Sequence, residues 1–330
     1  MKVLITGGAG FIGSHLTEEL LRGGNEVTVI DDLSTGRREN IAHLEGKPDF
    51  HFVQDSIMNK ERMRELIDDG EIVYHLAAAV GVKFVIDHPL KSMEINVRGT
   101  EIVLELAGQD KKKVLLTSTS EIYGKKEDGI FKEDDDRILG TTTISRWSYS
   151  CTKALDEFLA LAYYRERKLP VVIVRLFNTC GPRQRGRYGM VIPRFVEQAL
   201  SGKPITVYGD GKQTRSFSYV TDVVKAMISL TNHPRAVGEI FNVGSKEGVA
   251  IAELAKKIKQ LTASQSEIVL LPYEEAYEKG FEDMRHRIPD ITKIRQLIGY
   301  SPRVGLDEML KRIIESKIGL NDFLIFVLGS

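Results

Sequence analysis

The chain has 330 residues with 46 basic and 46 acidic side chains, and therefore no formal net charge. Its length fits about two domains, and its balanced charge argues against a nucleic-acid-binding protein, which usually carries a basic excess. Cys151 and Cys180 are the only two cysteines, which excludes a disulfide scaffold and favours a reducing, cytoplasmic location. We see no signal peptide and no apolar run long enough to span a bilayer, so we expect no membrane association.

Short apolar runs rich in β-branched residues alternate with segments of helical periodicity in the first half of the chain. Strands are predicted at Val3–Thr6, Val27–Asp31, Ile72–Ala77, Val114–Ser118 and Val171–Phe177, and helices at Ile12–Arg22, Ser92–Ala107 and Tyr149–Arg167. This alternation is typical of a parallel sheet with helices on both faces, whose buried strands are continuous apolar runs. The predicted fold class is therefore α/β, with a Rossmann-type doubly wound parallel sheet.

The alternation ends after Phe177, where loops, prolines and several arginines follow. Later elements are a helix at Val220–Thr231, a further strand of the large sheet at Ile240–Val243, and helices at Ala250–Thr262 and Asp307–Ser316. We assign residues 1–177 and 220–246 to a nucleotide-binding domain and residues 178–219 and 247–320 to a smaller C-terminal α/β substrate domain. Residues 321–330 are interpreted as a short apolar tail.

A glycine pattern lies between the first strand and the first helix. Gly7, Gly10 and Gly13 are spaced three residues apart, with Phe11 and Ile12 between the last two. The first glycine permits a tight turn, the second a close approach to a pyrophosphate, and the third close helix–sheet packing. The helix N-terminus then attracts the phosphates, so the pattern predicts a dinucleotide site.

Acidic residues after the next two strands add to this site. Asp31 and Asp32 end the second strand, where a carboxylate binds the ribose hydroxyls and repels a 2′-phosphate, so NAD is favoured over NADP. Arg37 and Arg38 nearby weaken that preference. Asp55 follows strand-like residues and suits the adenine amino group. Further cofactor contacts are expected at Ser34, Gly36 and Ser56.

Tyr149 and Lys153 are four residues apart and share one face of a predicted helix. A tyrosine with a pKa of about 10 is a poor base at neutral pH. A neighbouring ammonium and the positive charge of bound nicotinamide favour the phenolate. The pair therefore predicts a catalytic base, whereas the alternative is an ordinary surface pair.

A hydroxyl-rich stretch, Thr117–Gly124, follows the strand that begins at Val114. It lies at the carboxyl end of a parallel strand, where ligands bind in open α/β sheets. Ser118 is a candidate cofactor contact, and Thr119, Ser120 and Glu121 are candidate catalytic residues. The histidines show no metal-ligand spacing, so no metal site is predicted.

Together, GGAGFIG (7–13), LAA (76–78), STSEIYG (118–124), YSCTK (149–153) and RLFNTCGPR (175–183) resemble the extended short-chain dehydrogenase/reductase family. More narrowly, they resemble its NAD-dependent nucleotide-sugar epimerases, dehydratases and decarboxylases. The resemblance extends from Met1 to about Gly319. It implies that Tyr149 is the base, that Lys153 binds the nicotinamide ribose, and that Thr119 contacts the sugar 4-hydroxyl. It also implies cofactor contacts at Leu76, Ala77, Ala78 and Asn96.

The same resemblance implies a binding region for a UDP-sugar in the second domain. Its residues are Asn178, Val191, Thr206, Tyr208, Arg215, Asp283 and Arg285. Thr206 and Tyr208 would flank the base, and Arg215 would bind the diphosphate, for which a guanidinium group is well suited. Members of the family commonly pair two helices into a four-helix dimer interface, so a homodimer is expected through the helices at 92–107 and 149–167.

Glu121 does not decide which nucleotide sugar is the substrate. STSE resembles UDP-glucuronate decarboxylases, while Ser120 replaces the aspartate of the dehydratases and argues against 4,6-dehydration. The leading expectation is an isomerase, a UDP-glucose 4-epimerase that interconverts UDP-glucose and UDP-galactose through a 4-keto intermediate. The alternatives are a UDP-glucuronate 4-epimerase or decarboxylase and, remotely, a non-catalytic sensor. Arg183, Arg185 and Arg187, in the loop after Pro182, could bind a C5 carboxylate, and Arg185 and Arg187 could offset its repulsion by Glu121. We expect Arg185 and Arg187 to serve mainly phosphates or solvent, and UDP-glucose to be preferred to UDP-glucuronate.

Overall fold

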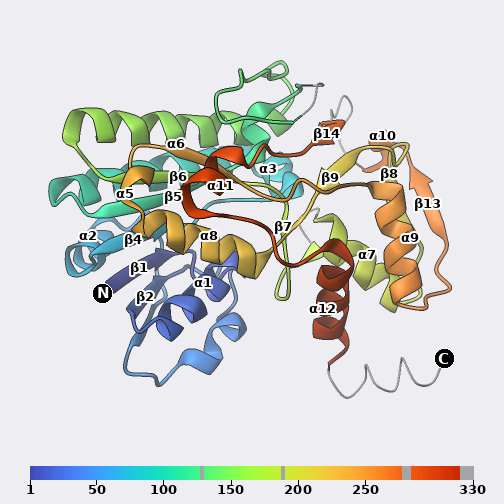
Figure 1. Ribbon diagram of the computed structural model, residues 1–330, viewed down its shortest axis with the longest axis horizontal. Coiled ribbons are helices and arrows are strands. Elements are labelled where there is room, and N and C mark those ends of the chain that lie inside the picture. Colours follow the sequence, from blue (N-terminus) through green and yellow to red (C-terminus); the bar gives the residue numbers. More distant parts are fainter. Residues whose placement is uncertain (127–129, 187–189, 277–283, 320–330) are drawn as a thin grey trace.

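The computed structural model of the chain describes residues 1–126, 130–186, 190–276 and 284–319 (Figure 1). Two residues named above, Arg187 and Asp283, and the tail at 321–330 lie outside the described residues. No described helix is long and apolar enough to cross a membrane.

A seven-stranded parallel sheet forms the larger part of the molecule, with strand order β11-β6-β5-β4-β1-β2-β3. The chain builds outward from β1 on one side and returns beside it with β4, so the order reverses between these two strands. In doubly wound folds, ligands bind at such a reversal, beyond the carboxyl ends of the strands. The predicted fold class is confirmed. The strands are β1 (Lys2–Thr6), β2 (Glu26–Ile30), β3 (Phe50–Val53), β4 (Ile72–His75), β5 (Lys113–Thr119), β6 (Val171–Leu176) and β11 (Ile240–Val243).

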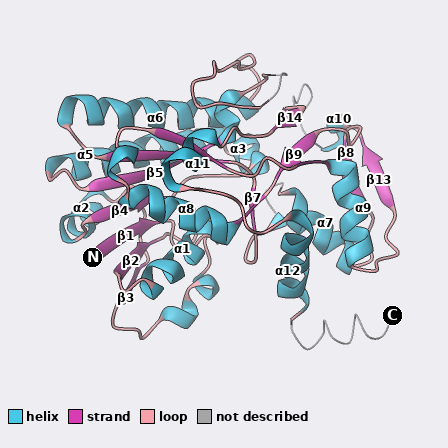
Figure 2. Ribbon diagram, viewed as in Figure 1, coloured by secondary structure: helices cyan, strands magenta, loops and turns pink. Residues whose placement is uncertain are grey.

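Helices cover both faces of this sheet (Figure 2). On one face, α2 (Lys60–Asp69), α5 (Gly99–Gln109) and α6 (Arg146–Arg167) bury apolar side chains such as Met63, Val103 and Ala160. On the other face, α1 (Phe11–Arg22), α8 (Val220–Asn232) and α11 (Thr292–Ile298) bury Leu16, Met227 and Ile294. Burial of both sheet faces explains why the strands are continuous apolar runs.

A second, smaller group of elements has its own apolar core. Helices α7 (Val191–Leu200), α9 (Ile251–Leu261) and α12 (Leu306–Ile318) pack around Phe195, Leu254 and Ile313. Two small sheets accompany them, with orders β12-β9-β14 and β13-β8. Their strands are β8 (Ile205–Tyr208), β9 (Thr214–Ser216), β12 (Gly248–Ala250), β13 (Ile268–Leu271) and β14 (His286–Arg287).

Helix α11 departs from the division made by sequence position. It falls within residues 247–320, yet Ile291, Ile294 and Tyr300 belong to the core under the large sheet. The remaining elements are short. They are α3 (Val82–Asp87), α4 (Pro89–Met93), α10 (Tyr273–Ala276), β7 (Thr179–Cys180), β10 (Ser218–Tyr219), the π-helical turn η3 (Glu94–Arg98) and the 3₁₀ turns η1 (Arg38–Asn40), η2 (Ala42–Leu44), η4 (Ser120–Tyr123) and η6 (Pro234–Ala236).

The helix expected at 92–107 is interrupted by a π-helical turn. Helix α4 leads into η3, and α5 begins at Gly99. Single π-helical turns occur frequently at functional sites because they redirect one side chain. Here the turn contains Asn96, which is 1% exposed.

Helices α4 and α6 expose large apolar side chains. Phe158 is 64% exposed, Leu155 44% and Leu90 67%. In contrast, Val103 and Leu106 of α5, which the sequence offered for the same role, are buried within the chain. Apolar side chains gathered on one surface are a common mark of an interface, so we expect α6 and α4 to contribute it.

We predict that the protein is a homodimer in which α6 packs against its copy. Replacing Phe158 with glutamate places a charge in that interface and should reduce the mass measured by light scattering, at micromolar concentration, to that of a monomer. Leu270→Glu is the control, because Leu270 is 56% exposed on β13, far along the chain from these helices. A monomeric mass for the unmodified protein would contradict the prediction.

Candidate active site

A cavity of about 510 Å³ opens at the carboxyl ends of the central strands and extends to the second group of elements. Its volume lies within the range of small-molecule sites. Residues from the glycine loop, the end of β5, the start of α6 and strands β8 and β9 all line it. The fold therefore brings together segments that are distant in the sequence.

The glycine loop forms the cofactor end of this cavity, where Gly7, Gly10, Phe11, Ile12 and Gly13 all line the wall. Gly7 has a φ of +74°, which only glycine adopts easily. A Cβ atom on Gly13 would lie 2.2 Å from the carbonyl oxygen of Gly7, so a side chain there would displace the loop. This backbone cradle at the start of α1 fits a pyrophosphate.

Asp31 joins the loop to the second strand. Its Oδ2 accepts a hydrogen bond from the Ala9 amide at 3.0 Å, and its Oδ1 accepts one from Leu33 at 2.9 Å. Burial raises the pKa of Asp31, and these backbone donors oppose the shift. Gly36 lies outside the lining, and a Cβ atom there would lie 2.6 Å from Asp31 Oδ1. Gly36 therefore leaves room for the carboxylate.

The other predicted cofactor contacts fall into two groups. Asp32, Ser34, Asp55, Ser56 and the segment Leu76–Ala78 line the cavity. Asn96 does not, although it holds the adjoining residue: its Oδ1 accepts from the Ala79 amide at 2.7 Å, and its Nδ2 donates to the Ala79 carbonyl at 3.3 Å. Asn96 thus lies behind the cavity lining and holds the backbone of Ala79, which is part of that lining.

Tyr149 lies in the first turn of α6 and lines the cavity. Burial raises the pKa of its phenol, and the negative charges of Glu121 and Asp156 act in the same direction. The phenol is therefore protonated at neutral pH unless a positive charge reaches it.

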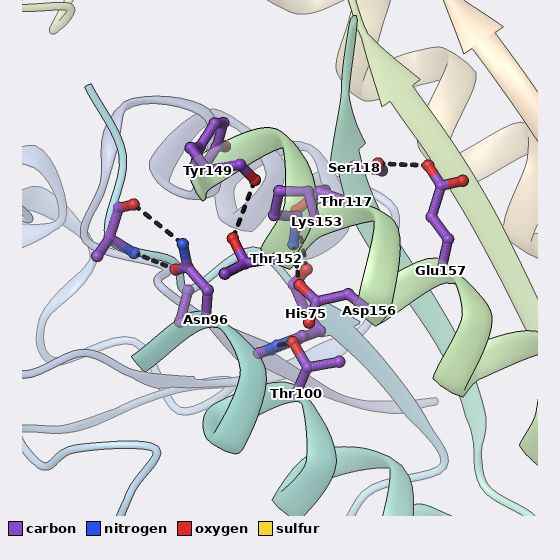
Figure 3. A network of polar contacts seen from close by, with 12 residues as sticks. His75, Asn96, Thr100, Thr117, Ser118, Tyr149, Thr152, Lys153, Asp156 and Glu157 are labelled. Carbon is purple, nitrogen blue, oxygen red and sulfur yellow. Dashed lines mark hydrogen bonds and ion pairs between the residues drawn. The ribbon is translucent and has the colours of Figure 1, made fainter. Parts of the chain in front are cut away.

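Lys153, one turn further along α6, also lines the cavity and is 3% exposed. Its Nζ donates to Oδ2 of Asp156 at 2.8 Å (Figure 3). The sequence interpretation predicted that the Lys153 ammonium favours the phenolate of Tyr149, and it did not identify Asp156. A polar residue three positions after the lysine, on the face that should enter the core, is the signal that could have identified it.

The hydroxyl-rich stretch ends β5 and continues into η4, and residues 117–121 all line the cavity. Thr119 Oγ1 accepts from the Glu121 amide at 3.2 Å. Ser118 donates to Glu157 of α6 (Figure 3). Ser120 is 1% exposed. This turn therefore presents its side chains to the same space as Tyr149.

Two arginines that the sequence interpretation missed hold Glu121. Arg146 Nη2 lies 3.1 Å from Glu121 Oε2, and Arg287 Nη1 forms an ion pair with Oε1. Both arginines line the cavity. Arg146 begins the helix that bears Tyr149, which is a local signal. Arg287 arrives from β14, a distance along the chain that no local pattern spans.

The nucleotide end contains most of the residues predicted for it. Asn178, Val191, Tyr208 and Arg215 line the cavity. Thr206 and Arg285 do not. Thr206 exchanges hydrogen bonds with Gln198, and the Arg285 side chain is 60% exposed and pairs with Asp210 at 2.8 Å. Arg287, two residues after Arg285, lines the cavity.

The loop after Pro182 was the sequence candidate for reading a substrate carboxylate. Arg183 Nη1 donates to Ser14 Oγ at 3.1 Å, and its Nη2 pairs with Glu18 at 2.5 Å. It is therefore tied to α1, at the cofactor end. Arg185 lines the cavity but is exposed.

Comparison with known proteins identifies the family. The sequence profile of the GDP-mannose 4,6 dehydratase family matches residues 4–313. The chain belongs to this family. The resemblance to short-chain dehydrogenase/reductase-type enzymes of nucleotide sugars is thereby confirmed. Because the family is NAD-dependent, the predicted cofactor is confirmed as well.

Individual relatives cover nearly the whole chain. A UDP-N-acetyl-alpha-D-glucosaminuronate decarboxylase of Bacillus cytotoxicus is 45% identical over 315 residues, which is 95% of this chain and 97% of the relative. The structure of a Bacillus cereus UDP-glucuronic acid 4-epimerase with UDP-glucuronic acid and NAD has a TM-score of 0.86 and 31% identity, covering 96% of this chain and 98% of that one. A Thermotoga maritima UDP-glucose 4-epimerase with UDP-glucose has a TM-score of 0.86 and 32% identity, again covering 96% and 98%.

We predict that Tyr149→Phe lowers kcat about 10²–10⁴-fold, because the variant loses only the hydroxyl that exchanges a proton. NAD affinity measured by calorimetry should remain within about twofold, which corresponds to less than about 0.5 kcal/mol. Tyr163→Phe on the same helix, outside the cavity lining, is the matched control and should keep full activity. Near-normal turnover in Tyr149→Phe would remove Tyr149 from the role of base.

Proposed function

We propose that the protein is an NAD-dependent decarboxylase of a UDP-linked uronic acid. The observation that carries this proposal is the pairing of Glu121 with Arg146 and Arg287. Glu121 is paired with two guanidinium groups in a part of the cavity also lined by Tyr149. Its negative charge is therefore balanced, and a substrate that bears a carboxylate next to the reacting carbon is compatible with this part of the cavity.

Pairing of Glu121 with two arginines reverses the expectation drawn from the sequence. An unpaired Glu121 would repel a uronate carboxylate by about 4 kcal/mol at ~4 Å with an effective dielectric of ~20. The arginines considered for offsetting it were Arg185 and Arg187. Arg146 and Arg287 perform that neutralisation instead. The ground for preferring UDP-glucose is thereby lost, and the uronate alternative becomes the proposal.

The chemistry follows from oxidation at C4. NAD, held at the glycine loop, would supply a reversible hydride acceptor for this carbon. Tyr149 takes the proton of the 4-hydroxyl, and the Lys153 ammonium positions Tyr149 and favours its phenolate form. A ketone at C4 stands β to the carboxylate on C5, so the electrons of the C5–carboxylate bond can move toward the ketone oxygen as CO2 leaves. Protonation at C5 and reduction at C4 then give a UDP-pentose, with NAD unchanged overall.

The relative at 45% identity supports the same class of reaction, since its name describes decarboxylation of a 2-acetamido uronate on UDP. The Bacillus cereus UDP-glucuronic acid 4-epimerase likewise binds a UDP-linked uronate together with NAD. We therefore propose UDP-linked uronates as the substrate class, with glucuronate and its 2-acetamido analogue as the two compounds to compare.

The deciding experiment is product analysis by NMR with NAD and one substrate at a time: UDP-glucuronate, UDP-N-acetylglucosaminuronate or UDP-glucose. We predict that a uronate loses CO2 and yields the UDP-pentose, while UDP-glucose yields little UDP-galactose. A 4-epimer that keeps its carboxylate, or efficient conversion of UDP-glucose, would contradict the proposal in favour of an epimerase. Bound NAD without any turnover would favour a sensor.

A second prediction concerns Arg287. Arg287→Gln keeps a hydrogen-bond donor but removes the charge, so kcat/KM for the uronate should fall about 100-fold, a typical cost of losing one buried charged partner. Arg295→Gln is the control, because Arg295 is an exposed arginine of α11 outside the cavity lining. Unchanged kcat/KM in Arg287→Gln would show that Arg287 does not serve the substrate.

A further inference from the structure

A buried ion pair lies directly behind the base. Lys153 is 3% exposed and Asp156 is fully buried, and their Nζ and Oδ2 atoms are 2.8 Å apart. Ion pairs are seldom buried so completely, because each charge loses its hydration. The cavity lining includes Lys153 but not Asp156. Asp156 therefore contacts the lysine from the protein interior.

The other groups around this pair do not share its charge. His75 of β4 contacts Thr100 Oγ1 through Nε2 at 3.1 Å and Thr6 Oγ1 through Nδ1 at 2.8 Å (Figure 3). Burial lowers the pKa of His75 to about 3, and the charge of Lys153 adds to that shift, so the ring is neutral at neutral pH. Glu157, next to Asp156, is bound to Arg175 at 2.8 Å. Asp156 is thus the carboxylate that contacts Lys153 in the described part of the chain.

Burial raises the pKa of Asp156, while the Lys153 ammonium and the Thr100 hydroxyl favour its charged form. Asp156 is also seven residues after Tyr149 and therefore on the same face of α6. Its charge reaches the phenol: Asp156 and Glu121 both raise the pKa of Tyr149, after burial itself. Glu121 is neutralised by two arginines, whereas Asp156 has Lys153, the cation that the phenolate also requires.

We propose that Asp156 is a positioning residue of the Tyr149–Lys153 pair, which holds the Lys153 ammonium and partly cancels its charge as felt by Tyr149. The inference rests on the proposed role of Tyr149 as base. The ion pair with Asp156 explains how a buried lysine ammonium lies beside Tyr149 without its full electrostatic field acting on the phenol. Asp156 thereby sets how strongly Lys153 promotes loss of the phenol proton.

The sign of the effect follows. Asparagine at position 156 can still accept a hydrogen bond from the ammonium but carries no negative charge. Removing that charge favours the phenolate, so the pKa of Tyr149 falls and the base is active at lower pH. Removing one nearby charge commonly shifts the pKa of a neighbouring group by about one unit. We expect the acid limb of the pH profile of kcat to move down by about one pH unit in Asp156→Asn.

The direct test titrates Tyr149 by NMR in the protein complexed with NAD, using tyrosine labelled with ¹³C at Cζ. The resonance is assigned by its loss in Tyr149→Phe. Asp156→Asn should lower the titration midpoint by about one pH unit relative to the unmodified protein. Glu166→Gln, which removes an exposed carboxylate from the same helix, should leave the midpoint unchanged.

An unchanged midpoint, or one that moves upward, would overturn the proposal, since an upward move means that Asp156 acts mainly by keeping Lys153 protonated. The NMR titration needs no turnover of a UDP-sugar, so failure of the proposed decarboxylation would leave its outcome readable. Should Asp156→Asn fold poorly by thermal melting, Asp156→Ser offers a second neutral acceptor. A downward shift in that variant supports the proposal, and its absence refutes it.

Discussion

The geometry of the site depends on a buried ion pair between helix α6 and strand β6. Arg175 Nε and Nη2 donate to the two carboxylate oxygens of Glu157 at 3.0 and 2.8 Å, and both residues are 5% exposed. Ser118, at the end of β5, donates to the same carboxylate. Removing one partner of such a pair commonly costs about 3–5 kcal/mol. The pair fixes the rotation of α6 about its axis and its position along the sheet, so that Tyr149 and Lys153 face the hydroxyl-rich turn.

Pairing of charges recurs throughout the cavity. Lys153 is matched by Asp156 and Glu121 by Arg146 and Arg287. In a site shielded from water each unpaired charge would be costly, so the fold supplies partners before any ligand arrives. A substrate must therefore compete with partners already in place. Tyr149, the proposed base, is the ionisable group whose protonation state depends on the balance among them.

The sequence predicted the features that depend on residues close together in the chain. The glycine loop, the parallel sheet and the Tyr149–Lys153 spacing each depend on a few neighbouring residues, and the structure places them as expected. Contacts between distant segments were not predictable in the same way. Arg287 reaches Glu121 across 166 positions of the chain, and the family pattern pointed to Arg285, two residues earlier. Asp156 was not predicted because an aspartate on a helix is usually exposed, whereas this one is fully buried.

The same oxidation can serve an epimerase or a decarboxylase, so the fold and the base do not distinguish them. A 4-keto intermediate without a carboxylate can only be reduced again, on either face. One with a carboxylate on C5 has a second route, because the new ketone accepts the electrons of the breaking bond. On the proposed function, the charge around that carbon selects the substrate. There Arg146 and Arg287 pair with Glu121, so the carboxylate of a uronate does not face an unbalanced negative charge. The residues proposed to select the substrate thus come from the start of α6 and from β14, while the proposed base Tyr149 and Lys153 lie on α6 itself.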